Sequence, residues 1–434
     1  MANLQLFLIY SCIFISLIFL IVLVLTRPKY FMLSFIVLAP IVNIFWSYKI
    51  YVLSVLDIFY GIFPLLFIFI YVRLKDREWV WGRFNKYFLL VLLVYLIPFL
   101  RLILKGTLSL NALELLLKIF FGYAVYCLSI NLLEVGEDKK ITNLILFAVL
   151  VTNMMLVFQL ITGNVPHEEA WRMSGLYHDP GQYTRMALLG IIILLPSLKL
   201  IRNKIHLVSK YSMLMLCVVT LGYSVSRNVV LSVIAIFIVC GFYLRRYFLI
   251  PVLSLSVLGF YLASPQVQDR YEHKFEKEIR YFSSSGEDIP VETLGSGRVG
   301  VWERTMESFK ESNLFQKFFG TGQDIGPHGQ FFGLLSSVGI FGLIISVFLY
   351  IMFFKFILAK VRADRNDSLA LYSFLIIIDT LVMSVGSAPI TNYYLQGILF
   401  MFVALLENRD RMIQESESYI FLEKNRQEKN RIRI

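Results

Sequence analysis

The stretch QFFGLLSSVGIFGLIISVFLYIMFF, residues 330–354, contains 25 residues and no charged side chain. An α-helix rises about 1.5 Å per residue, so a helix of this length can cross a hydrocarbon core of about 30 Å. A backbone inside lipid must satisfy its own hydrogen bonds, and a continuous apolar run of this length does so as a helix and not as a barrel strand. The stretch therefore predicts a membrane-spanning helix.

Comparable apolar blocks recur along the chain, in which 58% of the residues are hydrophobic and 16% are charged. The first block has no basic residue before it and no small-residue cleavage site after it, which favours a retained span over a signal peptide. We predict an all-α polytopic membrane protein with about 12–13 transmembrane helices. The expected spans are residues 4–26, 31–47, 51–72, 87–104, 109–133, 141–162, 183–198, 211–224, 228–243, 247–263, 330–354, 368–386 and 390–406.

Basic residues are distributed unevenly between the predicted connections. The segments on the side of residues 73–86 hold 26 of the 41 Lys and Arg residues, whereas the short segments on the opposite side hold four. Positive charge concentrates on the cytoplasmic side of membrane proteins, so this side and the C-terminus are predicted to be cytoplasmic. The net charge of +11 is therefore explained by basic residues that set the topology and attract anionic lipid at the cytoplasmic face. No nucleic-acid partner is expected.

One connection is far longer than the others. Residues 264–329 hold eight basic and eleven acidic side chains, and their part 301–319 has the mixed apolar spacing of an amphipathic helix near the outer membrane face. Four regions follow from this pattern. They are transmembrane helices 1–10 in residues 1–263, the large external loop 264–329, transmembrane helices 11–13 in residues 330–406, and a charged, partly disordered cytoplasmic tail 407–434.

A transporter is the default hypothesis for a protein with many spans. Transporters usually contain internal repeats or ionisable residues at mid-membrane depth, and this sequence has no internal repeat. Its ionisable residues inside predicted spans are expected to have structural or positioning roles. Glu114 and Lys118 can neutralise each other at i, i+4, and Arg101 can reach the interface, which leaves Asp57 and Asp379.

Five side chains at predicted external helix ends suggest a different activity: Arg172, Arg185, Arg227, Arg298 and His328. Guanidinium groups bind phosphate oxygens in a bidentate manner, and imidazole accepts a proton near neutral pH. Transfer of a sugar from a lipid-linked diphosphate needs both properties, one for the departing diphosphate and one for the attacking hydroxyl. The chain contains no D-x-D and no H-E-x-x-H motif, so no metal site and no cofactor are expected.

The stretch GSGRVG, residues 295–300, matches the dinucleotide-binding pattern G-x-G-x-x-G. That fingerprint requires a preceding strand in a βαβ unit, which this helical pattern does not predict. We predict instead a glycine-rich turn at a helix start, where backbone N–H groups and Arg298 face an anion. Each candidate also has a structural alternative: a local ion pair for Arg172 and Arg298, an interfacial anchor for Arg227, and a helix cap for His328.

Three sequence blocks share the same predicted side of the membrane. They comprise Arg172, Ser174, Gly175, Asp179 and Pro180; then Ser226 and Arg227; then the pattern S-G-R…W…F-G-T-G…H…L-L…G-I-F-G from Ser296 to Gly342. At these residues the chain resembles the bacterial O-antigen polymerase and O-antigen ligase superfamily, which includes the Wzy-type polymerases. Members commonly have Asn after the D-P pair and after the histidine, where this chain has Gly181 and Gly329.

The resemblance implies a GT-C-like, metal-independent glycosyltransferase in the bacterial plasma (inner) membrane, working at the external or periplasmic face. By this likeness His328 activates the acceptor hydroxyl, and Arg298, Arg172 and Arg227 hold the diphosphate and the sugars. Arg185, at the start of its predicted span, is a further candidate for binding substrate. The expected partners are polyprenyl-diphosphate-linked oligosaccharides as donor and acceptor, membrane lipid, and a chain-length regulator protein.

A polysaccharide polymerase is the favoured function, because polymerases vary most in sequence and this chain keeps only the skeleton of the pattern. Two alternatives stay open. An O-antigen ligase would transfer the finished glycan to lipid A-core or another acceptor, and a transporter or flippase would move the lipid-linked sugar without forming a bond.

Overall fold

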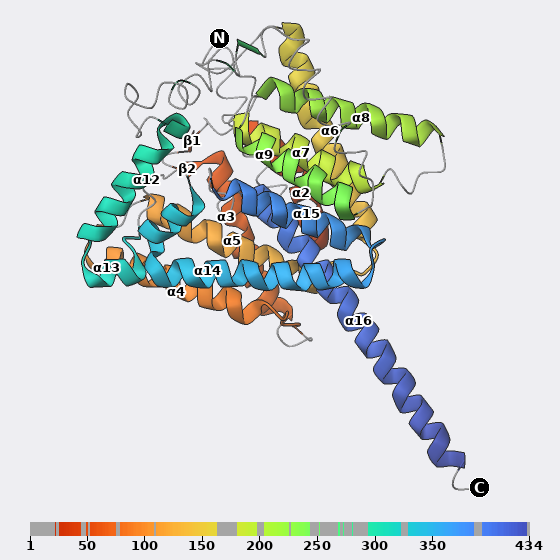
Figure 1. Ribbon diagram of the computed structural model, residues 1–434. Coiled ribbons are helices and arrows are strands. Elements are labelled where there is room, and N and C mark those ends of the chain that lie inside the picture. Colours follow the sequence, from red (N-terminus) through yellow and green to blue (C-terminus); the bar gives the residue numbers. More distant parts are fainter. Residues whose placement is uncertain are drawn as a thin grey trace.

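The computed structural model describes residues 26–44, 49–50, 53–74, 79–107, 110–162, 180–197, 204–224, 227–243, 294–322, 329–385 and 393–431, with a few isolated positions besides. Within these ranges the chain is almost entirely helical (Figure 1). The first nine elements are α2 (Pro28–Ile44), the two-residue strands β1 (Lys49–Ile50) and β2 (Leu53–Ser54), α3 (Val55–Leu74), α4 (Asn85–Leu104), α5 (Leu110–Leu132), α6 (Asp138–Thr162), α7 (Pro180–Ser197) and α8 (Lys204–Ser224). They are followed by α9 (Arg227–Tyr243), α12 (Leu294–Glu311), α13 (Leu314–Phe319), α14 (Gln330–Ala363), α15 (Ser368–Met383) and α16 (Tyr393–Arg431).

The described helices have the length and composition of membrane spans. Five of them are long and apolar enough to cross a membrane: Asn85–Leu104, Ala112–Leu132, Asp138–Gln159, Ile205–Gly222 and Gln330–Ala363. Five shorter apolar helices accompany them. The prediction of an all-α membrane protein is confirmed at this level. The expected spans 4–26 and 247–263 lie almost wholly outside the described residues.

The helices pack around α5 and the first half of α16, which contact each other extensively. Small residues permit this close approach, since a Cβ on Gly122 would lie 2.6 Å from the ring of Phe400. The same core contains a tight group of aromatic rings, in which Phe35 lies 4.9 Å from Phe63 and 5.5 Å from Phe121 between ring centroids. Aromatic pairs at these distances contribute about 0.5–1.5 kcal/mol each beyond the burial of their area.

The outward faces of these helices are also apolar. Large aliphatic side chains such as Leu65, Leu93, Ile161 and Ile205 are exposed, Ile161 by 79% and Ile205 by 77%. A water-soluble protein rarely exposes so much apolar surface, whereas lipid hydrocarbon solvates it well. The outer surface therefore agrees with the membrane assignment.

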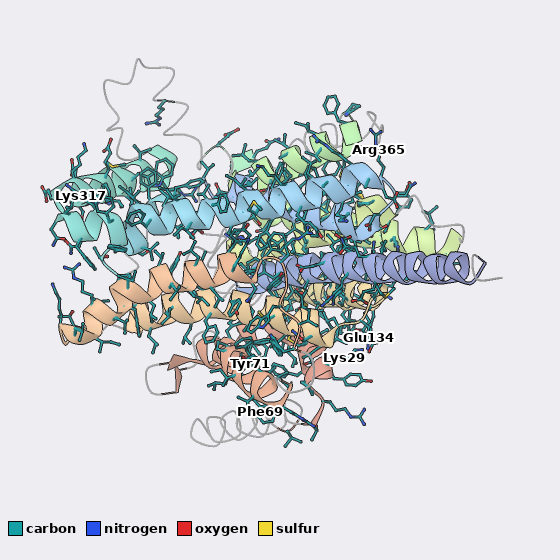
Figure 2. The ribbon with its side chains drawn as sticks, turned by 90° about the horizontal axis from the view of Figure 1, so that it is seen from below. Lys29, Phe69, Tyr71, Glu134, Lys317 and Arg365 are labelled. Atoms are coloured by element: carbon teal, nitrogen blue, oxygen red, sulfur yellow. The ribbon has the colours of Figure 1, made fainter. Side chains whose placement is uncertain are left out.

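Charged contacts gather where the predicted cytoplasmic connections lie. Figure 2 shows Lys317 at one end of the bundle and Lys29, Glu134 and Arg365 toward the other. At this second end Lys29 contacts Glu134 at 2.7 Å, and Arg409 contacts Asp367, the N-cap of α15, at 2.8 Å. We call it the charged end, and the opposite one the α13 end.

Three ionisable groups inside predicted spans have partners in the structure, and the pairing of Glu114 with Lys118 is the one expected from the sequence. Glu114 and Lys118 form an i, i+4 ion pair on α5, and the Arg101 guanidinium lies 4.7 Å from the ring centroid of Phe315 on α13. The side chain of Asp57 is outside the described residues. Asp379 is treated with the candidate site.

Three elements differ from the sequence-based expectation. The predicted amphipathic helix at 301–319 is two helices, α12 and α13, and α12 begins at Leu294, so that GSGRVG forms its first turns and not a turn before it. The tail expected to be partly disordered continues α16 as helix to Arg431, beyond the body of the bundle (Figure 1). The span expected at 330–354 is interrupted at Gly339 and extends to Ala363.

Candidate functional site

The candidate site lies where five helices meet. α7 contacts α9 and α15, α9 contacts α15, and α14 contacts both α12 and α15. The ends of these helices carry most of the residues predicted for the site. We call this region the helix-end junction and define it by Arg185, Asn228, Arg298, Trp302, Gln330 and Ser384.

Arg298 connects α12 to the start of α9. Its Nη1 donates a hydrogen bond to Oδ1 of Asn228 at 3.2 Å, across 70 positions of sequence. Asn228 directly follows Arg227, the first residue of α9, so two of the predicted arginines occupy adjoining positions of the fold. The side chain of Arg227 itself lies outside the described residues.

Trp302 joins this arginine to the start of α14. It lies four residues after Arg298, which places both side chains on the same face of α12. Its ring stacks on Phe332, with centroids 5.3 Å apart and planes at 13°. The indole nitrogen also borders Gly329, where an added Cβ would lie 3.0 Å away.

The space at position 329 is limited. A Cβ added there would lie 3.0 Å from the Trp302 indole nitrogen, which is a tight contact, and 3.5 Å from the Val385 carbonyl oxygen, which is an ordinary van der Waals distance. A side chain at this position would therefore require Trp302 to shift. His328 and Arg172 lie outside the described residues, but the position following His328 belongs to the junction.

The first part of α14 is held against the end of α15. The backbone N–H of Gln330 donates to the Ser384 carbonyl at 3.0 Å. At the other end of this segment, the carbonyls of Ser336 and Ser337 accept hydrogen bonds from Thr321 and Gly322, both at 2.9 Å. Backbone hydrogen bonds to residues outside the helix therefore hold both ends of the segment 330–338.

The interruption at Gly339 turns the chain back on itself. Its φ of 69° and ψ of −168° are not helical, and a Cβ there would lie 2.5 Å from the backbone of Phe318. One cavity of about 200 Å³ is lined from both parts of α14, by Gln330 and Leu334 before the turn and by Val347, Tyr350, Ile351 and Phe354 after it. A straight helix would place Gln330 and Phe354 about 36 Å apart, so the first segment is folded toward the second.

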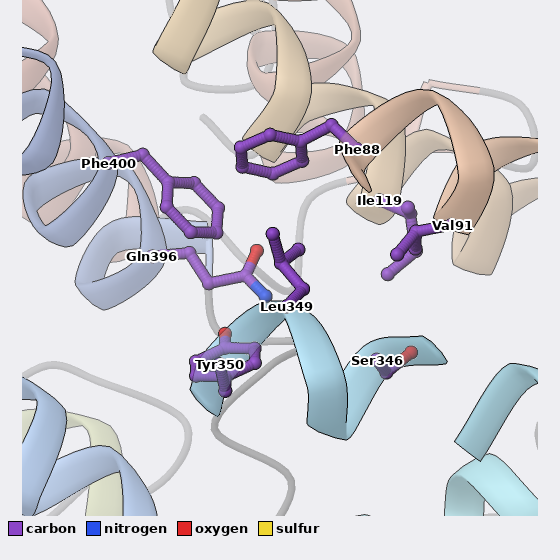
Figure 3. Close-up of a pocket in the computed structure, with 8 residues that line it drawn as sticks. All are labelled: Phe88, Val91, Ile119, Ser346, Leu349, Tyr350, Gln396 and Phe400. Carbon is purple, nitrogen blue, oxygen red and sulfur yellow. The ribbon is translucent and has the colours of Figure 1, made fainter. Parts of the chain in front are cut away.

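Leu381 and Ser384 of the α15 end complete the lining of this cavity, which is predominantly apolar. A second, smaller cavity of about 20 Å³ lies between α4, α5, α14 and α16 (Figure 3). It has room for about one water molecule beside the Tyr350 hydroxyl and the Gln396 amide. Tyr350 lines both cavities.

A buried acid completes the junction. Asp379, on α15, is 1% exposed, and its helix contacts both α7, which carries Arg185, and α9, which carries Ser232. Arg185 lies in the second turn of α7, next to the fully buried Thr184. Arg185 was predicted from the sequence as a site residue, whereas Asp379 was expected to have a structural or positioning role. The available signal was a lone carboxylate in a helix of otherwise apolar and hydroxyl residues.

The structure thus brings Arg298 to the start of α9, next to Arg227, and brings Trp302 of the same helix to Gly329. No group of three or more potential metal ligands from His, Cys, Asp and Glu occurs among the residues whose placement is described. An arginine at these helix ends, with an apolar cavity lined by the neighbouring Gln330, can bind an amphiphile with an anionic headgroup. A comparison with protein-family models finds no match, and a comparison with curated proteins finds none either.

Proposed function

We propose that the protein is a polysaccharide polymerase of the O-antigen or capsule type. It joins polyprenyl-diphosphate-linked oligosaccharide repeat units at the external face of a bacterial plasma membrane. The observation that carries this proposal is the hydrogen bond of Arg298 to Asn228, because it unites two of the three motif blocks beside Gly329. The resemblance of those blocks to the polymerase and ligase superfamily supplies the reaction.

The junction offers the groups that the reaction requires. The acceptor hydroxyl oxygen attacks the anomeric carbon of the donor sugar, a new C–O bond forms, and the bond to the diphosphate oxygen breaks. The leaving diphosphate takes the electron pair, and Arg298 and Arg185 stabilise its charge. His328 accepts the hydroxyl proton as general base. Arg172 and Arg227 hold the substrate beside them.

The proposed topology places the α13 end outside and the charged end in the cytoplasm. The concentration of Lys and Arg at the charged end supports this orientation. α12 and α13 then belong to the large external loop of a GT-C-like glycosyltransferase, and α14 enters the membrane from it. The apolar cavity beside Gln330 matches the hydrocarbon of a lipid-linked sugar.

Substitutions His328→Ala and Arg298→Ala test this proposal. Both proteins should insert stably, and cells should carry single repeat units on their surface glycolipid with no long chains. Two matched controls are His206→Ala and Arg304→Ala, which change exposed side chains on α8 and on α12. A full ladder of chain lengths on a gel from both site variants would refute the catalytic roles.

An assay in which the purified protein receives only lipid-linked repeat units distinguishes a polymerase from a ligase. Elongation without a second acceptor excludes the ligase, whereas product that forms only when lipid A-core or another acceptor is added refutes the polymerase. A transporter would form no glycosidic bond in either assay. Loss of elongation on adding a metal chelator would contradict the metal-independent mechanism.

A further inference from the structure

The short helix α13 carries four large apolar side chains in six residues, yet none of them is buried. Its sequence is LFQKFF, Leu314–Phe319, and no residue of the helix is buried. Leu314 is 72% exposed and Phe315 is 41% exposed. A helix in an aqueous loop normally turns such side chains inward, because contact of apolar surface with water is unfavourable. The composition and exposure of α13 therefore fit an apolar environment.

The position of α13 along the bundle is the end of a membrane span. The Arg101 guanidinium of α4 lies 4.7 Å from the ring centroid of Phe315. Arg101 belongs to the last turn of α4, Asn85–Leu104, which is long and apolar enough to cross a membrane. A helix of 20 residues is about 30 Å long, which matches the thickness of the hydrocarbon core. Phe315 therefore lies level with the boundary between hydrocarbon and headgroups.

The exposed surface of α13 is continuous with the exposed apolar surfaces of two spans. On α4, Ile103 and Leu104 are exposed by 46% and 87%. On α14, Phe341 is 42% exposed, and its ring centroid lies 5.1 Å from that of Phe318 and 5.4 Å from that of Phe319. The lipid that covers the outer surfaces of α4 and α14 therefore extends over α13 as well.

α13 is attached rigidly to the folded-back segment of α14. Directly after the helix, the backbone N–H of Gly322 donates to the Ser337 carbonyl at 2.9 Å. A Cβ on Gly320, the C-cap of α13, has no room because the Ser337 carbonyl fills that space. An interaction that holds α13 in place therefore also holds the first segment of α14.

Two cations border this surface at the end of α4. Lys105, the C-cap of α4, is exposed, and Arg101 lies one turn before it. Neither residue forms an ion pair within the part of the chain that the structure describes. Lys and Arg side chains at the end of a span extend their charged groups toward lipid headgroups. Both cations can therefore reach lipid phosphates at the edge of the bilayer.

We propose that α13 is a membrane anchor that binds anionic phospholipid. Leu314 and Phe315 insert among the acyl chains at the α13 end, and Arg101 and Lys105 bind the phosphate groups of the same lipids. The bilayer thereby holds α13, and with it the folded-back segment of α14, at a fixed depth. This inference concerns the lipid surface alone and does not depend on the proposed function or on which side of the membrane the α13 end faces.

Photocrosslinking of the full-length protein in proteoliposomes tests the inference. The residue at Leu314 is replaced by photoreactive p-benzoylphenylalanine, which on illumination bonds to C–H groups beside it. The vesicles contain equal amounts of phosphatidylglycerol and phosphatidylcholine, and mass spectrometry identifies the adduct. We expect a phospholipid adduct from position Leu314, as from the exposed apolar reference Ile344 on α14, and none from Glu307, an exposed acid on α12.

The headgroup of the crosslinked lipid tests the two cations. Phosphatidylglycerol adducts at Leu314 should exceed phosphatidylcholine adducts about fivefold, because cations near the surface attract anionic lipid. The double substitution Arg101→Gln with Lys105→Gln should remove this preference. Lys139→Gln changes an exposed cation on α6 at the charged end, and this control should keep the preference. If the double variant is not recovered as folded protein, Lys105→Gln alone, at an exposed position, should still lower the preference.

Absence of a phospholipid adduct at Leu314 overturns the inference. A protein–protein adduct in its place would show that a second copy of the chain covers α13. A preference for phosphatidylglycerol that survives the substitutions at Arg101 and Lys105 would also overturn it, because these cations would then take no part in lipid binding.

Discussion

Arg298 and Asn228 are 70 positions apart in sequence, yet the guanidinium of one donates to the side-chain oxygen of the other at 3.2 Å. This bond ties the first turns of α12 to the start of α9. It also orients Arg298 without neutralising it, because the amide acceptor carries no charge. A guanidinium has five N–H donors, of which this bond uses one.

Asn228→Ala should therefore impair the reaction without abolishing it. Loss of one hydrogen bond that orients a charged group is expected to lower the elongation rate about tenfold, or ~1.4 kcal/mol. The measurement is the rate of chain elongation by purified protein. Asn366→Ala, in the turn at the charged end, is the control and should retain the wild-type rate. Wild-type elongation by Asn228→Ala would show that the bond does not position Arg298.

Gly329→Ala should lower activity because the added methyl group meets the Trp302 indole nitrogen at 3.0 Å. The expected displacement affects the chain next to His328 more than the global stability. Trp302→Phe removes the crowding atom, so the double variant should elongate faster than Gly329→Ala alone. Gly61→Ala is the control, because a Cβ there meets nothing within 4 Å. A fully active Gly329→Ala protein would contradict the proposed crowding.

Gly339→Ala should destabilise the protein by more than about 2 kcal/mol, because two costs combine. A left-handed φ of 69° costs an alanine about 1–2 kcal/mol, and its Cβ would lie 2.5 Å from the backbone of Phe318. Thermal unfolding in detergent measures the effect. Gly106→Ala separates the two costs, since this residue has a φ of 66° but open space around it. Equal losses for both variants would leave no role for the contact at Gly339.

Tyr126→Phe should lower the free energy of unfolding by about 1–3 kcal/mol. The hydroxyl donates to Glu407 at 2.7 Å and accepts from the backbone N–H of Phe84 at 3.1 Å, so its removal leaves a buried donor without a partner. Tyr87→Phe is the control, because the Tyr87 hydroxyl makes no hydrogen bond among the described residues. Chemical denaturation of both variants measures the difference, and equal midpoints would contradict this account.

The lengths of the apolar runs in the sequence predicted the bounds of most described helices to within a few residues. α4 occupies Asn85–Leu104 where residues 87–104 were expected, and α5 occupies Leu110–Leu132 where 109–133 were expected. The turn at Gly339 could not be predicted in this way, because a glycine in an apolar run also fits a straight span. What fixes the turn is the contact with Phe318 and Gly320, which is a tertiary feature.

The candidate site was predictable to a similar extent. Residue type and predicted side of the membrane selected Arg185 and Arg298, and the structure joins Arg298 to the start of α9 through Asn228. The partners Asn228, Trp302 and Asp379 could not be assigned, because they come from other helices whose relative rotation no local pattern encodes. Asp379 carried a signal of its own as a lone intramembrane acid, but its neighbours Arg185 and Ser232 emerged only from packing.

In the proposed function, the folded-back segment of α14 also sets the depth of the reaction. Gln330 and Gly339 are nine positions apart, which places the start of α14 about 13 Å of helix below the turn. A sugar bound at that depth would be screened from bulk water by α12, α13 and the turn itself. For a glycosyl transfer, the acceptor hydroxyl would then face little competition from hydrolysis. Opening the turn should release free oligosaccharide in place of polymer.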